Sequence, residues 1–316
     1  MSLADKTFKA MCEDILTNGY TNNGQNVRPH WEDGTPAYTI AKNAIVNKYD
    51  LSKEFPAITL RRTPIKTCTE EMLWIWQRKD NNVNNLDSTV WDEWKRPDGT
   101  IGMAYGYQQA KLHLYKIDPI LLPKVFKDGR FNDKKTQFRT HDRLVASKSA
   151  NDCWYMNQLD KAIYDLTNNP LSRRIIVTMW SPDDGWDMAL EPCAYEVTFM
   201  TRIENNEFIL DMTLHQRSND ILAAGNWNVC QYAVLQHMVA RHVGMKVGVL
   251  THVIENAHIY DRHIPIIENL IKREEYDAPT FWLDPSIDNF YDFTKDSVKL
   301  ENYKVGEQVK NIPIAI

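Results

Sequence analysis

Two stretches of alternating apolar and polar residues constrain the fold most, because only a short polar segment separates them. In residues 195–200, Tyr, Val and Phe alternate with Glu, Thr and Met. In residues 208–215, Phe, Leu, Met and Leu alternate with Ile, Asp, Thr and His. Such a period of two indicates β-strands. The segment Glu204-Asn205-Asn206-Glu207 supplies turn residues, so residues 194–216 are predicted to form a β-hairpin.

Reactive side chains stand at the open end of this hairpin. Pro192-Cys193 precedes the first strand and Gln216-Arg217-Ser218 ends the second, so pairing brings Arg217 beside Cys193. A free thiol with a pKa near 8.5 is only about 3% ionised at neutral pH, so a nucleophilic cysteine needs nearby positive charge. Arg217 and the pair Arg173-Arg174 are candidates for that charge. The arrangement suggests covalent chemistry on a phosphorylated substrate, although a lone cysteine is more often a small buried hydrophobe.

Length and composition are those of one globular domain spanning residues 1–316, with 43% hydrophobic and 25% charged residues. A net charge of −5 argues against general nucleic-acid binding, which normally needs a basic surface. The five cysteines, at positions 12, 68, 153, 193 and 230, show no CxxC spacing, so neither a disulfide framework nor a metal site is expected. No signal-peptide pattern or long apolar run is present, so we expect a cytoplasmic protein without membrane contact.

The order of the remaining patterns predicts an α+β fold, with long helices separated from clustered strands. Apolar residues at helical spacing in residues 8–16 indicate a helix that ends at Asn18-Gly19. The segment Thr67-Cys68-Thr69-Glu70 reads as a capping box that opens a second helix and leaves Glu71 free for another role. Strands are expected at 175–180 and 249–254, and a buried helix at 229–243 before Gly244.

Several short motifs occur together in one order. They are Pro192-Cys193, Gln216-Arg217-Ser218-x-Asp220, Asn228, His258-Ile259-Tyr260-x-x-His263, Ser172-Arg173-Arg174, Trp91-Asp92-Glu93-Trp94, Tyr105-Gly106 and the terminal Pro313-Ile314-Ala315-Ile316. In order and spacing they resemble the thymidylate synthase family, over nearly the whole chain except roughly residues 110–155. The resemblance implies a mixed β-sheet packed by long helices, with one face of the sheet forming a dimer interface.

The resemblance also implies a reaction. A methyltransferase of this family would convert dUMP and 5,10-methylenetetrahydrofolate to dTMP and dihydrofolate, with no metal. Cys193 would add to carbon 6 of the pyrimidine, Glu71 would organise the water that moves protons at the pyrimidine carbonyl, and Tyr105 would assist proton removal from carbon 5. Desolvation against Trp74 and Ile75, one helical turn away, is expected to raise the pKa of Glu71.

Binding roles follow from the same resemblance. The nucleotide would be bound by Arg173, Arg174, Gln216, Arg217, Ser218, Asp220, Asn228, His258 and Tyr260. The reduced folate would contact Trp91, Trp94, Asp220, Trp227 and Ala315. In the family the two arginines that match Arg173 and Arg174 reach the phosphate of the other subunit, so a homodimer is implied.

Asn228 is expected to read the pyrimidine, because its amide offers one donor and one acceptor to the uracil edge. The amide can flip, so it excludes cytosine only if neighbouring groups fix its orientation. Either Asn226 or Asn228 could instead cap the buried helix. His258 and Tyr260 are not expected to share a strand face, but both could bind the 3′-hydroxyl of the deoxyribose at the end of a strand. The alternative is that they are simply a core histidine and a buried tyrosine.

Departures from the family pattern keep alternatives open. The chain has Ala223-Ala224-Gly225-Asn226-Trp227-Asn228 where the family usually has Leu-Gly-Leu-Pro-Phe-Asn, and Glu255-Asn256 where it has Gly-Asp. Ala194 follows the cysteine where many members have His. Near the N-terminus Glu32-Asp33-Gly34-Thr35 replaces the Arg-Thr-Gly phosphate loop, and Arg28 is the substitute that we consider.

The main alternative is a pyrimidine nucleotide hydroxymethylase, which would add water to the methylene instead of hydride, and a non-catalytic nucleotide-binding protein is a second. The apolar tail Ile314-Ala315-Ile316 favours the synthase, because in that family it folds over the site and excludes water. The basic segment at roughly 110–155 reads as a solvated surface, with attraction of an anionic folate tail as the other hypothesis.

Overall fold

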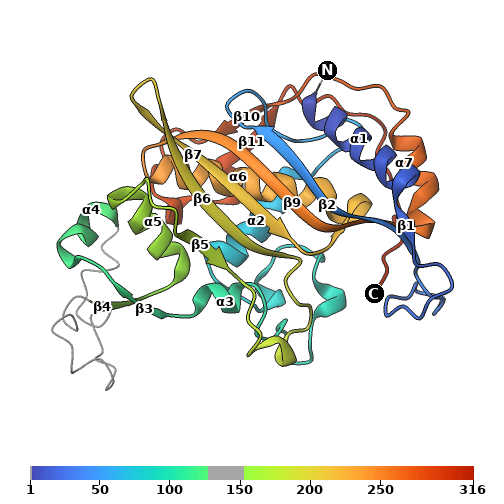
Figure 1. The fold of residues 1–316 in the computed structure, drawn as a ribbon, viewed down its shortest axis with the longest axis horizontal. Coiled ribbons are helices and arrows are strands. Elements are labelled where there is room, and N and C mark those ends of the chain that lie inside the picture. The colour runs from blue at the N-terminus through green and yellow to red at the C-terminus, as the bar shows by residue number, and fades with distance from the viewer. Residues whose placement is uncertain (1, 127–152) are drawn as a thin grey trace.

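The computed structural model describes residues 2–126 and 153–316, and the centre of the basic segment lies outside them. Its core is a sheet in the order β1-β2-β9-β7-β6-β5, with β8 paired to β9 (Figure 1). These strands are β1 Tyr20–Thr21, β2 Thr39–Asp50, β5 Ile175–Thr178, β6 Ala194–Glu204, β7 Glu207–Gln216, β8 Asn219–Asp220 and β9 Lys246–Tyr260. β9 is parallel to β7 and antiparallel to β2, so the sheet is mixed and the predicted α+β class is confirmed.

The predicted hairpin is formed by β6 and β7. Asn205 and Asn206 have φ values of 51° and 63°, which gives the short turn the left-handed backbone that suits the twist of a hairpin. At the other end Ala194 lies opposite Gln216, and the backbone N–H of Arg217 donates to the carbonyl of Cys193 at 2.9 Å. The expectation that the hairpin returns Arg217 to Cys193 is therefore confirmed.

A β-bulge interrupts β6 one residue after its start. The register shifts between Ala194 and Glu196, so Tyr195 is the extra residue. Its ring lies 6.3 Å from that of His215, and its hydroxyl donates to Glu255 on β9 at 3.1 Å. The expected alternation, with Tyr195 on the face of Val197, was therefore wrong at this position, because a bulge turns one side chain out of the strand pattern.

Strand β9 is longer than the predicted segment 249–254. It stays extended because β2 pairs with it as far as Tyr260, which lies opposite Thr39. The predicted alternation is confirmed in its centre, where Leu250, His252 and Ile254 are buried. At its end His258 and Tyr260 share one face, with ring centroids 5.0 Å apart, so the expectation that they do not share a strand face was wrong.

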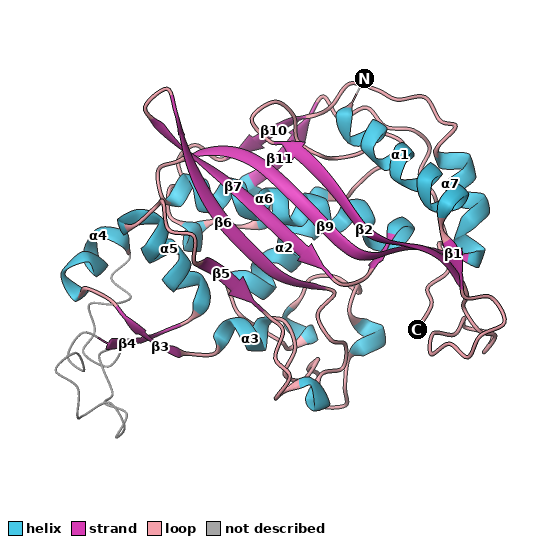
Figure 2. Cartoon of the chain, viewed as in Figure 1, coloured by secondary structure: helices cyan, strands magenta, loops and turns pink. Residues whose placement is uncertain are grey.

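Two long helices, α2 Ile65–Trp76 and α6 Asn226–His242, lie behind the sheet (Figure 2). Phe199 and Leu214 of the sheet share one core with Leu235 of α6 and Met72 of α2. The other described helices are α1 Leu3–Asn18, α3 Gly106–Ala110, α4 Leu122–Val125, α5 Gln158–Asn168 and α7 Ile264–Leu270, and the small sheets pair β3 His113–Lys116 with β4 Cys153–Met156 and β10 Thr280–Leu283 with β11 Val298–Glu301. None of the helices in the described ranges is long and apolar enough to cross a bilayer.

Both expected N-terminal helix caps were wrong, whereas the expected end of the first helix at Asn18-Gly19 is confirmed. α2 begins at Ile65, directly after Pro64, so the predicted capping box lies inside the helix and Glu70 pairs with Arg78 at 2.7 Å. Proline disfavours helical backbone in the residue before it, so Pro64 marks a boundary after which the helix begins. α6 begins at Asn226 after a π-helical turn, Ile221–Gly225, so Gly225 occupies the cap position and neither asparagine does.

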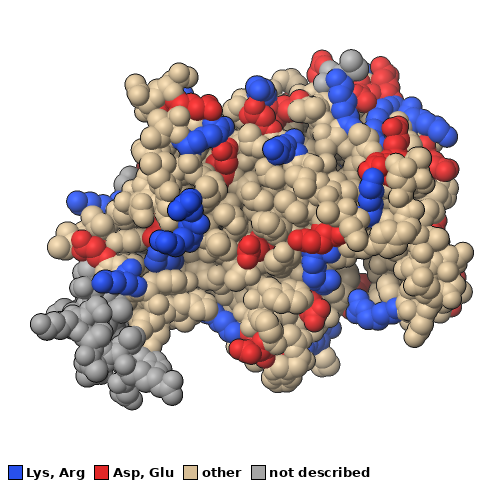
Figure 3. All heavy atoms as spheres, viewed as in Figure 1, with Lys and Arg blue, Asp and Glu red and all other residues tan. Residues whose placement is uncertain are grey.

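The face of the sheet opposite α2 and α6 carries no helix among the described residues (Figures 1 and 2). Its side chains include the half-buried Thr198, Thr213 and Thr251 and the exposed Ile176 and Met200. Figure 3 shows broad areas of this side of the molecule without charged residues. Such a surface is a candidate for contact with another protein.

Candidate active site

Cys193 and Arg217 form the centre of the site. The Nη2 atom of Arg217 lies 3.8 Å from the Sγ of Cys193 and donates to the carbonyl of Glu191 at 2.7 Å, while its Nε donates to the carbonyl of Pro192 at 3.1 Å. The guanidinium also lies over the ring of Trp180 at 6.0 Å. These contacts use Nε and Nη2, and Nη1 makes no hydrogen bond to any described residue. The guanidinium therefore keeps donors for an anion beside the thiol.

The thiol of Cys193 is half-buried, and burial raises its pKa. The charge of Arg217 opposes this rise most strongly, followed by a contact with Tyr105 and the charge of Arg28. As expected, the charge of Arg217 acts to lower the pKa of Cys193. Burial has the larger effect, so the net pKa is raised. At neutral pH the thiol is therefore mostly protonated, and its proton must leave as it reacts.

Tyr105 is held in an unusual backbone conformation, with a φ of 46° and a ψ of −103°. The next residue is a glycine because a Cβ at Gly106 would stand 1.8 Å from the carbonyl oxygen of Asp80. The buried hydroxyl of Tyr105 accepts the backbone N–H of Cys193 at 3.0 Å, and burial raises its pKa well above the usual value. Strained backbone conformations of this kind concentrate at functional sites.

Glu71 lies on α2 with its carboxylate enclosed by donors. Trp91 donates to Oε1 at 2.9 Å, and Trp227 and Gln231 donate to Oε2 at 2.6 and 2.8 Å. Burial raises the pKa of Glu71, and the three hydrogen bonds oppose the rise without cancelling it. The predicted direction is confirmed, although the contacts come from these donors and not from Trp74. A carboxyl group with a raised pKa is suited to moving protons near neutral pH.

Asn228 is joined to Glu71 through a chain of side-chain amides. Its Oδ1 accepts from Gln216 at 3.0 Å, its Nδ2 donates to Gln231 at 3.0 Å, and Gln231 donates in turn to Glu71. Asn228 itself is half-buried, so one donor and one acceptor position of its amide remain for a ligand. Gln216 is only 1% exposed. Its place is therefore behind Asn228, supporting the amide.

Asp220 and His258 lie side by side, because β8 pairs with β9 in a register that matches these two residues. The Oδ1 of Asp220 accepts the backbone N–H groups of Leu222 and Ala223 and lies 3.3 Å from the Nδ1 of His263. Burial acts to raise the pKa of Asp220, but His263 and His258 outweigh it, so the net pKa is lowered. Asp220 therefore carries a negative charge within the candidate site.

His263 links Asp220 to the C-terminal tail. Its side chain is fully buried, with Nδ1 facing Asp220 and Nε2 2.8 Å from the carbonyl oxygen of Pro313. Burial acts to lower its pKa, but Asp220, the Pro313 carbonyl and Asp261 outweigh it and raise the pKa. Beyond this link Ile316 exchanges two backbone hydrogen bonds with His30, at 2.8 and 3.0 Å. The tail that carries Ala315 is thus tied down at two points.

A pH prediction follows from His263. Because its pKa is raised on folding, it contributes stability that is fully present below about pH 6.5 and is lost as the pH rises through the folded pKa. We expect His263→Gln, which keeps a donor for Pro313, to be less stable than the wild type at pH 6, with a smaller difference at pH 9. Urea unfolding at several pH values measures this. A difference that is equal at both ends of the range would show that His263 carries no charge in the folded protein.

The aromatic side chains expected near the folate gather around Glu71, which binds Trp91 and Trp227. Trp91 is buried and contacts Trp94 and Tyr105 edge-on, with ring centroids 5.6 and 5.0 Å apart. Trp94 and Trp227 are half-buried. Because the indole N–H groups of Trp91 and Trp227 are bound to Glu71, these rings can offer a ligand only their faces and edges.

Arg173 and Arg174 lie away from this site. Both are exposed, and continuing the register of β5 with β6 places Arg173 opposite Thr201. Thr201 is about eight residues from Cys193, or roughly 26 Å along the strand. A single arginine side chain cannot span that distance. Arg28, by contrast, lies close enough for its charge to act to lower the pKa of both Cys193 and Tyr260. The net pKa of Tyr260 is nevertheless raised to about 12, mainly by burial.

Sequence reasoning missed two residues of the site. Gln231 could have been predicted from its spacing, since it stands three residues after Asn228 and therefore on the same face of the helix. His263 was part of a recognised motif, but its two contacts come from the tail and from β8, which no local pattern connects to it. The described residues contain no cluster of His, Cys, Asp and Glu that could hold a metal ion.

Comparisons with known proteins agree with this arrangement. Residues 6–315 match the family model described as thymidylate synthase. Thymidylate synthase 1 of Bacillus spizizenii is 36% identical over 98% of both chains, and thymidylate synthase of Bacillus phage phi3T is 35% identical with the same coverage. The solved structure of thermostable thymidylate synthase A from Bacillus subtilis matches over the full length of both chains, with a TM-score of 0.81 and 33% identity. The chain therefore belongs to the thymidylate synthase family.

Proposed function

We propose that this chain converts dUMP and 5,10-methylenetetrahydrofolate to dTMP and dihydrofolate. The observation that carries the proposal is one site in which a thiol lies 3.8 Å from a guanidinium and a half-buried asparagine is joined to a buried glutamate. A nucleophile, an anion-binding group, a pyrimidine reader and a proton-transfer group are what this reaction needs. Membership of the family supports the same reaction.

The nucleotide phosphate would be bound by the donors of Arg217 and Ser218. Arg28 joins them as the substitute for the phosphate-loop arginine, since its charge acts on both Cys193 and Tyr260. Guanidinium groups bind phosphate through paired, charge-assisted hydrogen bonds. His258 and Tyr260, which share one strand face, would meet the deoxyribose hydroxyl beside them.

The chemistry begins when the Cys193 sulfur forms a bond to carbon 6 of dUMP. The electron pair of the 5,6 double bond moves toward carbon 5 and the carbonyl oxygen, where the N–H of Asn228 stabilises it. The proton that the thiol loses is taken up at that carbonyl oxygen, and Glu71 holds or passes it there, so charge is conserved in the addition. Tyr105, whose hydroxyl stays protonated because its pKa is raised, relays the proton lost from carbon 5 and does not act as a phenolate base.

The residues present fit a reduced folate. Asp220 is charged and partly exposed, and its Oδ2 accepts no hydrogen bond from the described residues, so an acceptor remains for the pterin N–H groups. Trp91, Trp94 and Trp227 would supply flat aromatic surface for the pterin ring. When bound, the folate supplies the one-carbon unit and the hydride. The tail at Ala315, tied through His263 and His30, would exclude water while that hydride is transferred.

One assay tests the function. The protein is incubated with dUMP and 5,10-methylenetetrahydrofolate, and both products are identified by chromatography. We expect dTMP with dihydrofolate. Hydroxymethyl-dUMP with tetrahydrofolate would instead mark a hydroxymethylase, and dUMP binding without turnover would mark a binding protein.

The reading role of Asn228 predicts a change in specificity. Asn228→Asp replaces the donor by an acceptor, so uracil loses a partner and the amino group of cytosine gains one. We expect the ratio of kcat/KM for dUMP to that for dCMP to fall by roughly 10- to 100-fold, the cost of one mismatched bidentate contact. Asn226→Asp is the control, because the amide of Asn226 is bound to Ile58, Thr63 and Pro56. If the ratio is unaltered in Asn228→Asp, the assignment is wrong.

We further propose that the protein works as a homodimer through the open face of its sheet. A sheet face that no described helix covers can be covered by the same face of a second copy. The two arginines at the start of β5 lie far from their own thiol, so a partner's site is the one that they could serve. In this arrangement Arg173 and Arg174 of each subunit complete the phosphate site of the other.

Two expectations from the sequence stay predictions. The cytoplasmic location is one of them. The other is the role of the basic segment, whose residues 127–152 lie outside the described part of the chain.

A further inference from the structure

Asn228 can distinguish uracil from cytosine only if its amide has a fixed orientation, because a flipped amide offers the reverse pattern. Oxygen and nitrogen of such an amide are assigned from their partners. In this chain the partners are themselves amides, Gln216 and Gln231, so the question is what fixes those two.

Gln231 is fixed by two groups that accept from it. Its Nε2 lies 2.8 Å from the Glu71 carboxylate and 3.4 Å from the backbone carbonyl of Cys68. The side chain is 3% exposed, so water cannot replace these partners freely. The Oε1 of Gln231 must therefore face Asn228, and it accepts the Nδ2–H at 3.0 Å.

Gln216 is fixed in the same way from the other side. Its Nε2 donates to the backbone carbonyl of Ser218 at 3.0 Å as well as to the Oδ1 of Asn228. Its Oε1 accepts from Asn219 at 3.0 Å and faces the Nε2 of His252 at 2.7 Å. A flip of Asn228 would set two oxygens against each other at Gln231 and two amino groups against each other at Gln216.

We propose that Gln231 is a positioning residue that orients the Asn228 amide for uracil, by relaying the direction of hydrogen bonding from Glu71 and Cys68. The proposal rests on the proposed function, since it concerns how that site selects its pyrimidine. With the orientation fixed, the free N–H of Asn228 meets the uracil carbonyl oxygen and its free lone pair meets the ring N–H. Cytosine would place donor against donor and acceptor against acceptor.

Two variants of Gln231 separate orientation from packing. Gln231→Met keeps the volume and removes the hydrogen bonds to Asn228, Glu71 and Cys68, so only Gln216 still orients Asn228. We expect the ratio of dCMP to dUMP dissociation constants to fall about ten-fold, the loss of one hydrogen bond. Gln231→Glu keeps an acceptor toward Asn228, so this ratio should stay within about three-fold of the wild type. Its kcat should fall, because Glu71 gains a second carboxyl group as neighbour.

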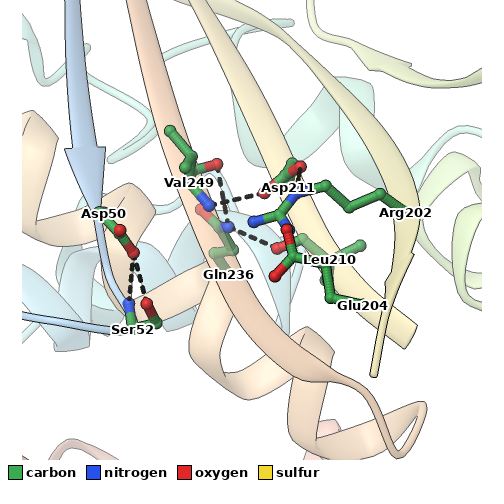
Figure 4. Close-up of polar contacts among 8 residues, drawn as sticks. All are labelled: Asp50, Ser52, Arg202, Glu204, Leu210, Asp211, Gln236 and Val249. Atoms are coloured by element: carbon green, nitrogen blue, oxygen red, sulfur yellow. Dashed lines mark hydrogen bonds and ion pairs between the residues drawn. The ribbon is translucent and has the colours of Figure 1, made fainter. Parts of the chain in front are cut away.

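Gln236→Met is the matched control. Gln236 lies on the same helix, is fully buried, and donates to the carbonyls of Leu210 at 2.8 Å and Val249 at 3.3 Å (Figure 4). Within the described part of the chain it makes no hydrogen bond to Glu71 or Asn228. It loses an amide of the same kind, so it reports any general effect of a buried Gln→Met change. We expect its nucleotide preference to match that of the wild type.

The measurement is calorimetric titration of each protein with dUMP and with dCMP, which share sugar and phosphate. If the wild type does not prefer dUMP, the proposed function itself fails. If the wild type prefers dUMP and Gln231→Met keeps the full preference, the role of Gln231 is refuted while the function stands. Should Gln231→Met fail to fold, as judged by circular dichroism, Gln231→Glu decides the matter: a retained preference supports the role and a lost preference overturns it.

Discussion

Replacing Cys193 by serine should abolish turnover while leaving dUMP bound. We expect kcat to fall by at least about a thousand-fold, because a hydroxyl with no adjacent base is a far poorer nucleophile than a thiol. The affinity for dUMP should change by less than about ten-fold, since Arg217 is held by backbone carbonyls and not by the sulfur. Steady-state kinetics and equilibrium titration measure the two quantities.

The control for this variant is a second thiol far from the site. Cys12 is fully buried on α1, and burial raises its pKa far above the usual value. Cys12→Ser should lower the free energy of unfolding but keep kcat per folded molecule near the wild-type value. Full activity in Cys193→Ser would refute the nucleophile assignment.

Removing Arg173 and Arg174 together should cost activity in a way that a second subunit can repair. If the two guanidinium groups bind a partner's phosphate, Arg173→Ala/Arg174→Ala should lower kcat/KM by about a hundred-fold or more. Unfolding and refolding an equal mixture of this variant with Cys193→Ser should restore about a quarter of the wild-type activity. Half of the dimers are then mixed, and each mixed dimer contains one complete site.

The triple variant that carries all three substitutions is the matched control for this mixture. When the triple variant is mixed with Cys193→Ser, no subunit carries the Cys193 thiol, so activity should not recover. Recovery only with the arginine variant supports sites shared between subunits. Full activity of the arginine variant alone would contradict the donation of these residues, and the loss of activity without recovery would place them outside a shared site.

The elements that the sequence predicted are those with strong local patterns. The hairpin, the helix that ends at Gly19 and the buried helix before Gly244 follow from periodicity and turn residues near in the chain. The errors arose where tertiary contacts override local preference. β2 keeps β9 extended to Tyr260, a bulge turns Tyr195 outward, and Pro64 starts α2 before the expected cap.

The candidate site likewise combines contacts that can be predicted from the sequence with contacts that cannot. Cys193 and Arg217 are close in space because a hairpin joins them, and a hairpin can be predicted from sequence. The enclosure of Glu71 cannot, since its donors come from segments about 20 and 160 residues away. The net rise in the pKa of Cys193 was likewise hidden, because the burial that causes it is a property of the whole fold.

The proposed reaction depends on a bond between the Cys193 sulfur and carbon 6 of the pyrimidine. The most direct test is the intact mass of the protein after incubation with 5,10-methylenetetrahydrofolate and 5-fluoro-dUMP, whose fluorine cannot leave carbon 5 as a proton does. We expect a stable adduct of protein, nucleotide and folate that maps to the peptide containing Cys193 and is absent from Cys193→Ser. An unmodified mass, or an adduct on another residue, would contradict it.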